Sequence, residues 1–156
     1  MRVAAAATLI VVTLLSAPPA MATGTLDCYV DDGGTIIGVH GIVPYGHSAT
    51  LLQVEAEVEA TMQGISADLA RTTFSSSHQI QFWLDDLSLN VMLYREREDS
   101  NLPFSATKLT IKTTRTNTDD EGAYRGRYDL LVYEMPKGAD VAGEAHAQGD
   151  IECVAG

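Results

Sequence analysis

Few residues of this chain are of types and spacings that could do catalytic chemistry. Its four histidines are His40, His47, His78 and His146, and none has the H-x-x-x-H or H-E-x-x-H spacing of a zinc site. No G-x-S-x-G motif occurs, and Gly46-His47-Ser48 lies in a turn-like stretch without the strand and helix that flank a nucleophilic serine. We therefore expect no catalytic residues, no resident metal and no cofactor.

Three acid-rich stretches have ligand types that suit a divalent cation. In the last segment Glu144, His146 and Asp150 fall on one face of a strand-like pattern. The stretches "DDGG" (31–34) and "TNTDDEG" (116–122) offer carboxylate oxygens, which Ca²⁺ prefers. Neither has EF-hand spacing, and Asp and Gly are also the residues of tight turns. We interpret the first as a solvated strand face and the other two as turns.

A row of like charges is a first candidate for recognition. Glu55, Glu57 and Glu59 alternate with apolar residues in "LLQVEAEVEATM", so they share one face of a strand. Adjacent carboxylates repel each other, so the row either has basic neighbours or forms an exposed acidic stripe that could bind a partner. The basic pairs that could neutralise it from later strands are Lys108 with Lys112 and Arg125 with Arg127.

A second candidate surface is aromatic and lies on a predicted hairpin. Trp83, Met92 and Tyr94 alternate with the apolar residues and have polar neighbours on their own face. Such residues are enriched at recognition surfaces. They form either an exposed patch or a set covered by residues 98–107. The residues expected on the core face of this hairpin are Ile80, Phe82, Leu84, Leu87, Leu89, Val91 and Leu93.

The chain has two cysteines, one near each end: Cys28 in "TLDCYV" and Cys153 in "QGDIECVAG". Each shares its strand face with an apolar residue, Leu26 and Ile151 respectively, so both point toward the core. We predict a Cys28–Cys153 disulfide that joins the first strand to the last. A redox-active pair would be closer in sequence, as in C-x-x-C.

Residues 1–22 have the pattern of a secretory signal peptide. One positive charge, Arg2, precedes an uncharged apolar run, and the small-residue pattern Ala20-Met21-Ala22 follows. The apolar run is shorter than the ~20 residues that a membrane-spanning helix needs. We therefore expect a mature domain of residues 23–156, with no membrane span, secreted or in the periplasm, where a disulfide can form.

The chain is acidic, with 10 basic and 21 acidic residues and a net charge of −11. Removing residues 1–22 removes Arg2 and no acid, which leaves nine basic residues against 21 acidic ones, or −12. This balance makes nucleic acid an improbable partner, because phosphate binding needs clustered lysine and arginine. It leaves room for a cationic partner, and the oligomeric state is open.

The elements that must position these residues are strands. Apolar residues recur with a period of two along most of the chain, and short Gly-, Pro- and Asp-rich turns separate the segments. The expected strands lie within residues 25–30, 35–43, 51–62, 65–74, 78–84, 87–96, 105–116, 123–134 and 141–153.

Eight to nine such strands predict an all-β antiparallel meander, folded into a β-sandwich or closed into an up-and-down β-barrel. In an uninterrupted nine-strand meander the first and last strands would run parallel where they met. The odd number of strands therefore favours a sandwich in which the first and last strands lie on facing sheets.

Three functions fit such a domain. The first is a non-catalytic module of the cell envelope or medium that binds a protein or glycan or assists assembly. The second is a carrier barrel for a small apolar ligand, since small residues on the inward face of the last strand could leave a cavity. The third is a hydrolase with an unrecognised site at His78 or His146. The small inward residues are Gly143, Ala145, Ala147 and Gly149.

Overall fold

The computed structural model describes residues 23–44, 50–116, 122–135 and 143–156, and these form a single sheet of nine antiparallel strands. The strands are β1 (Thr23–Asp31), β2 (Thr35–Pro44), β3 (Gln53–Ala60), β4 (Arg71–Ser75), β5 (Gln79–Leu84), β6 (Ser88–Glu96), β7 (Ser105–Arg115), β8 (Ala123–Glu134) and β9 (Gly143–Ala155). Short 3₁₀ turns, η1 (Ala67–Leu69) and η2 (Ser76–His78), flank β4. The predicted antiparallel meander is confirmed. The predicted signal peptide, residues 1–22, lies outside the described residues.

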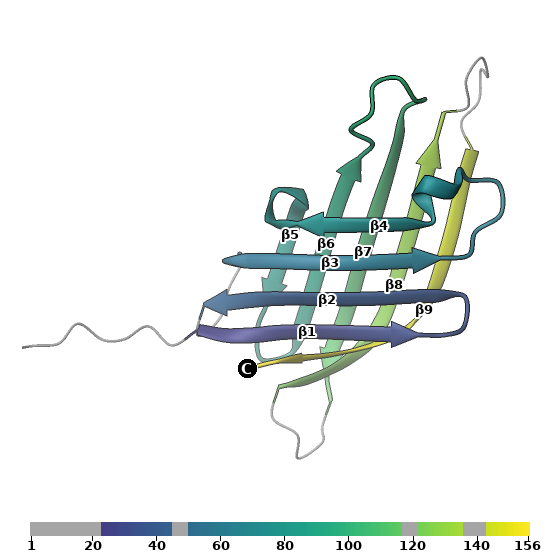
Figure 1. Ribbon diagram of the computed structural model, residues 1–156. Helices are drawn as coiled ribbons and strands as arrows, with labels where there is room; N and C mark the ends of the chain where they lie inside the picture. Colours follow the sequence, from purple (N-terminus) through teal and green to yellow (C-terminus); the bar gives the residue numbers. More distant parts are fainter. Residues whose placement is uncertain (1–22, 45–49, 117–121, 136–142) are drawn as a thin grey trace, which may run out of the picture.

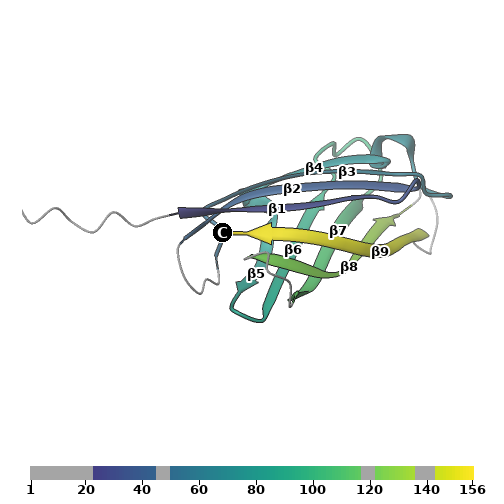
Figure 2. The ribbon, with the colours of Figure 1, turned by 90° about the horizontal axis from the view of Figure 1, so that it is seen from below.

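The sheet is folded so that its two halves face each other. Its strand order is β4-β3-β2-β1-β9-β8-β7-β6-β5, which makes β4 and β5 the two edges. Strands β1–β4 cross over β5–β9 (Figure 1), and a view from below shows the two halves as separate layers that meet where β1 lies beside β9 (Figure 2). The arrangement is a nearly closed sheet with the core between its halves. In the described residues no helix is long and apolar enough to cross a membrane.

The chain ends are paired within this sheet, and in this respect the expectation of ends on facing sheets is wrong. Strands β1 and β9 pair in antiparallel fashion, with Leu26 opposite Ala155 and Tyr29 opposite Glu152. The up-and-down alternation is broken elsewhere, between β4 and β5, which are consecutive in the chain but do not pair. Turn η2 connects β4 to β5 across this gap. Because these two strands do not pair, the first and last of the nine strands can still run antiparallel to each other.

The predicted disulfide lies at the centre of the β1–β9 pairing. Cys28 and Cys153 are direct register partners, their Cα atoms are 4.0 Å apart, and both side chains are buried. Beyond the pairing, the backbone N–H of Thr25 donates to the Gly156 carbonyl at 2.9 Å. The bond therefore joins the two chain ends where the sheet passes from one half to the other.

The core is filled by the inward residues of the alternating strands. Tyr128 is its largest fully buried side chain, and its ring lies over Gly149, its register partner on β9. A β-carbon on Gly149 would be 2.6 Å from Cε1 of that ring. The small residue on β9 thus accommodates the ring of Tyr128. The other fully buried large side chains are Phe82, Leu26, Ile37, Leu89, Leu93, Leu109, Ile111, Leu130, Ile151, Val54 and Val91.

Two local predictions differ from the structure. Residues 65–74 do not form one strand, because η1 occupies their first half and β4 begins only at Arg71. In β5 the register shifts between Gln79 and Gln81, which leaves Ile80 in a bulge and 60% exposed. Leu87, in the β5–β6 turn, is also exposed. A bulge on an edge strand locally disrupts its pairing, which protects the edge against further strand addition.

One end of the fold is held by a buried cluster around Arg97, which follows β6. Its guanidinium donates to both oxygens of Asp68 in η1, to Glu134 on β8 at 2.9 Å and to the Pro103 carbonyl at 2.6 Å. The backbone N–H and the hydroxyl of Ser66 also donate to Glu134. This cluster joins the β3–β4 connection to the opposite half of the sheet.

Glu134 is almost entirely buried, with 10% of its side chain exposed. Desolvation by itself would raise the pKa of Glu134, but hydrogen bonds from Ser66 and Arg97 outweigh it and hold the pKa below the usual 4.5. The carboxylate therefore remains charged inside the cluster.

Removing the disulfide should strongly destabilise the domain. Because the cysteines are 125 residues apart, loop-closure entropy predicts a loss of about 5 kcal/mol in the C28A/C153A variant. Urea unfolding of the variant and of the oxidised wild type measures this difference in the free energy of unfolding. Equal stabilities would contradict the assigned role.

Glu134 should make stability depend on pH in acid. Its folded pKa lies below its unfolded value of 4.5, so its stabilisation is present above that pH and is lost as the pH falls through the folded pKa. At neutral pH, Glu134→Gln should cost about 1–3 kcal/mol in free energy of unfolding. The difference from wild type should shrink below pH 4.5. At neutral pH the exposed control Glu144→Gln should cost only about 0–1 kcal/mol. A difference for Glu134→Gln that did not change with pH would contradict the role of this charge.

Candidate functional site

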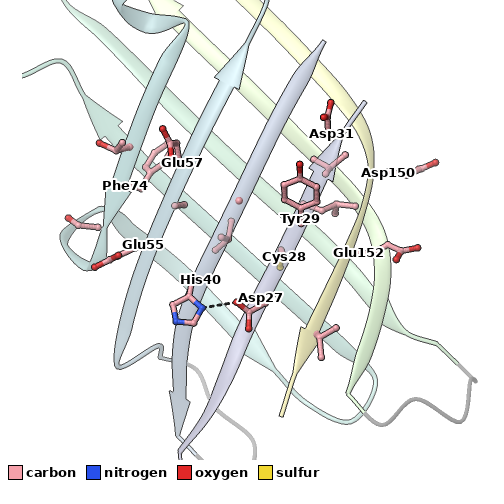
Figure 3. A pocket seen from close by; sticks show the side chains of 18 residues that line it. Asp27, Cys28, Tyr29, Asp31, His40, Glu55, Glu57, Phe74, Asp150 and Glu152 are labelled. Atoms are coloured by element: carbon pink, nitrogen blue, oxygen red, sulfur yellow. Dashed lines mark hydrogen bonds and ion pairs between the residues drawn. The ribbon is translucent and has the colours of Figure 1, made fainter. Parts of the chain in front are cut away.

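A groove of about 1260 Å³ lies on the outer face of β9, β1, β2, β3 and β4 (Figure 3). Strand β2 lies along its middle, with β1 on one side and β3 on the other. Outward residues of β1 and β3 form its sides, and the β2 residue between them, Gly38, has no side chain. The groove therefore follows from strand order together with one glycine.

The groove carries a single sign of charge. Six carboxylates line it, and no lysine or arginine is among its lining residues in the part of the chain that the structure describes. Its one histidine, His40, pairs with Asp27 at a distance of 2.7 Å from Nδ1 to Oδ1. Such a surface attracts cations before contact. The six carboxylates belong to Asp27, Asp31, Glu55, Glu57, Asp150 and Glu152.

Apolar surface accompanies this charge. Tyr29 on β1 is 63% exposed, and Val154 on β9 is 55% exposed. Both are among the residues that line the groove. In Figure 3, Tyr29 stands between the carboxylates of β3 and those of β9. An aromatic face flanked by carboxylates offers a partner both contact area and charge.

Arginines pair with acids around this groove, and they are not the ones expected for the glutamate row. Arg71 on β4 pairs with Glu59, and its Nε lies 3.8 Å from Glu57. The expected candidates Arg125 and Arg127 instead pair with acids of β9, at 2.9 Å from Glu152 and 3.2 Å from Asp150. Lys108 and Lys112 lie on β7, which is not a neighbour of β3.

These ion pairs are exposed. Exposed pairs of this kind contribute about 0–1 kcal/mol, so a cationic ligand could replace them at little cost. Glu55 has no cationic partner among the described residues and accepts only a 3.3 Å hydrogen bond from Gln53. The predicted row is therefore neutralised at Glu59, partly offset at Glu57 and open at Glu55.

The β1–β2 hairpin, which contributes the middle of the groove, is held by the "DDGG" turn. Gly33 has a φ of 82°, and the Asp32 carboxylate accepts hydrogen bonds from the backbone N–H groups of Gly34 and Thr35. Its other oxygen accepts a 2.5 Å hydrogen bond from the Tyr128 hydroxyl on β8.

The hydrogen bond from Tyr128, with those from the two backbone N–H groups, lowers the pKa of Asp32. Burial, followed by the bond to Asp32, raises the pKa of Tyr128. The stretch functions as a turn, as predicted, and its carboxylate ties the hairpin to the other half of the sheet.

The aromatic candidates lie on the other half of the molecule. Trp83 on β5 is opposite Asn90, and Gln81 is opposite Met92, so these side chains share the outer face. Trp83 is 47% exposed, whereas Met92 and Tyr94 are half-buried. The structure thus places Trp83, Met92 and Tyr94 apart from the glutamate row on β3.

Trp83 is held in place at the hairpin turn. Its Nε1 donates to Asp85 at 2.8 Å, and this bond, with those from the backbone N–H groups of Leu87 and Ser88, lowers the pKa of Asp85 to about 2. Burial, with a hydrogen bond to Glu96, raises the pKa of Tyr94.

The other chemistry-bearing residues have local partners. His146 lies 3.7 Å from Glu144, and Asp150 pairs with Arg127. His78 accepts from the Ser75 backbone N–H at 2.9 Å as part of the η2 turn. Within the described ranges no group of three His, Cys, Asp or Glu residues could hold a metal ion. His47 and residues 117–121 lie outside those ranges.

Several groove residues were not singled out from the sequence: Tyr29, Gly38 and Val154 among them. The alternation of Asp27, Tyr29 and Asp31 was visible in the first strand. However, only the pairing of β1 with β9 and of β2 with β1 and β3 shows that Tyr29 lies in register with Glu152 on one side and, across Gly38, with Glu57 on the other.

Comparison with protein-family models, with curated proteins and with solved structures finds no match to this chain. The function proposed below rests on the residues of the chain itself.

The position of Trp83, the only tryptophan of the chain, should be visible in its fluorescence. Because the indole is 47% exposed, its emission should be red-shifted and readily quenched by acrylamide. Steady-state emission and quenching of the oxidised protein test this. A blue, protected emission would contradict the placement of Trp83 on the outer face.

Proposed function

We propose that this chain is an exported, non-catalytic β-domain that binds a basic segment of a protein partner in the acidic groove. The observation that carries the proposal is the groove itself, a large depression with six carboxylates and an exposed tyrosine at its centre. Glu55 and Glu57, from the predicted glutamate row, belong to this groove. A partner with lysine or arginine would replace weak exposed ion pairs and add contact with the Tyr29 ring.

Export is supported by two independent features. Residues 1–22 have the charge and apolar pattern of a secretory signal peptide. The buried Cys28–Cys153 disulfide is typical of proteins that fold in an oxidising compartment. We therefore propose that the mature domain acts outside the cytoplasm, secreted or in the periplasm.

A protein partner is favoured over a glycan because of charge. Six carboxylates would repel an acidic glycan and offer a neutral sugar no charge complementarity, whereas they attract lysine and arginine side chains. The carrier hypothesis is weakened by the packing of Tyr128 over Gly149, which occupies space that an internal ligand would need. The hydrolase hypothesis is weakened because the His78 ring accepts a hydrogen bond from the Ser75 backbone N–H, which gives this histidine a structural role in the η2 turn.

The proposal predicts that groove charge controls binding. The E55Q/E57Q variant should bind a short peptide of alternating arginine and glycine about tenfold more weakly than wild type, the loss expected for two partly exposed charge contacts. Isothermal titration calorimetry of the oxidised domain at low salt measures this affinity, which should fall with added salt.

A matched control removes two carboxylate charges at positions outside the groove. Glu96, the last residue of β6, and Glu98, two residues further along the chain, are exposed and outside the groove. The E96Q/E98Q variant should bind the peptide nearly as well as wild type. Equal weakening in both double variants would mean that net charge alone attracts the peptide, and lack of wild-type binding would overturn the proposed function.

A further inference from the structure

Gly38 differs from the other glycines of the sheet. Six glycines lie within the described strands, and most have a neighbour that leaves no room for a side chain. A β-carbon on Gly126 would be 2.1 Å from the Lys112 carbonyl oxygen, and one on Gly41 would be 3.0 Å from that of Gln53. A β-carbon on Gly38 would have nothing within 4 Å.

The backbone of Gly38 does not require glycine either. Positive φ angles occur, among the described residues, only at Gly33, Gly64 and Gly122. Glycine weakens the interior of a strand, and where it occurs there it often marks a place that a ligand or another backbone approaches closely. The fold of the described residues therefore gives no packing reason for Gly38, and the space above it opens into the groove.

A second tyrosine–glycine pair in the same sheet shows how an aromatic ring can occupy the space above a glycine. On the inner face, Tyr128 and Gly149 are register partners, and the ring covers the glycine. On the outer face, Tyr29 and Gly38 are also register partners, yet Tyr29 remains 63% exposed and the space at Gly38 stays open. The outer pair therefore leaves an empty position beside an available aromatic face.

The residues around this position define what would fit. Glu57 is the register partner of Gly38 on β3, and Glu152 is the register partner of Tyr29 on β9. The position thus lies between a carboxylate and an aromatic ring, with a second carboxylate behind the ring. A planar guanidinium can stack on a tyrosine and pair with a carboxylate through two parallel hydrogen bonds, which an ammonium cannot do.

We infer that the space above Gly38 is a socket for one arginine side chain of the bound segment, with its guanidinium stacked on Tyr29 and hydrogen-bonded to Glu57. This inference rests on the proposed function and adds to it a specific contact and a preference for arginine over lysine. The arginine that occupies the socket belongs to an extended basic segment of the partner. This segment lies along β2, between the outward side chains of β1 and those of β3.

The test uses variants that leave the charge unchanged. Gly38→Val fills the socket, and because a β-carbon there meets nothing and valine favours strands, the variant should be at least as stable as wild type. It should bind the arginine–glycine peptide about tenfold more weakly, the equivalent of one lost charge-assisted hydrogen bond. Tyr29→Leu, a second variant, should bind about three- to fivefold more weakly through the lost cation–π contact.

Matched controls separate the socket from general attraction. Thr114→Val introduces a valine at an exposed position on β7, outside the groove, and should bind like wild type. A lysine–glycine peptide of equal length should bind wild type more weakly than the arginine peptide, and this preference should disappear in Gly38→Val. Calorimetry measures the affinities, and thermal unfolding confirms that each variant is folded.

The outcomes distinguish the two proposals. If wild type binds the peptide and E55Q/E57Q weakens it while Gly38→Val and Tyr29→Leu do not, the socket is wrong and the acidic groove remains the binding site. If arginine and lysine peptides bind wild type equally, the stacked guanidinium is wrong. If wild type binds neither peptide, both the socket and the proposed function are overturned.

Discussion

Both faces of the sheet depend on the antiparallel pairing of β1 with β9, which the Cys28–Cys153 disulfide locks at directly opposed register positions. The pairing joins two groups of strands from opposite ends of the chain into one sheet, so that β1–β4 can fold over β5–β9 (Figure 2). On the inner face it completes the core. On the outer face it brings the acids of β9 beside Tyr29, and the groove would lose one side without it.

The pairing of β1 with β9 goes together with a break in pairing between β4 and β5, which are the two edges of the sheet. A sheet that closes through its termini must stay open elsewhere if nine strands alternate, and here the opening lies between consecutive strands. Side chains hold the halves together near it: Arg95 on β6 donates to the Thr73 carbonyl of β4 at 2.7 Å, and Arg97 joins η1 to β8 through Asp68 and Glu134. The low pKa of Glu134 reflects this function, since the charged form is the one that the cluster binds.

Some carboxylates of the outer surface have arginine partners and others do not. The groove acids on β9 have arginine partners from β8, and Glu59 has Arg71, but Glu55 has no cationic partner among the described residues. Since exposed pairs are weak, this distribution does little for stability. It concentrates negative potential over β2, where Gly38 leaves space and Tyr29 offers an aromatic face. These two features distinguish the groove from an ordinary solvated strand face, and they carry the proposal of an arginine socket.

The amino-acid sequence by itself determined the period-two strands, a count of eight to nine, the inward direction of Cys28 and Cys153 and the outward direction of the glutamate row, because alternation in a strand is a local property. The "DDGG" turn followed for the same reason. Tertiary structure decided where the meander breaks, how β1 pairs with β9, which groups pair with Arg71 and Arg97, and that a groove forms around Gly38. Pairing between distant strands depends on backbone hydrogen bonds that nearly every residue can make, so apart from the two cysteines the sequence does not record it.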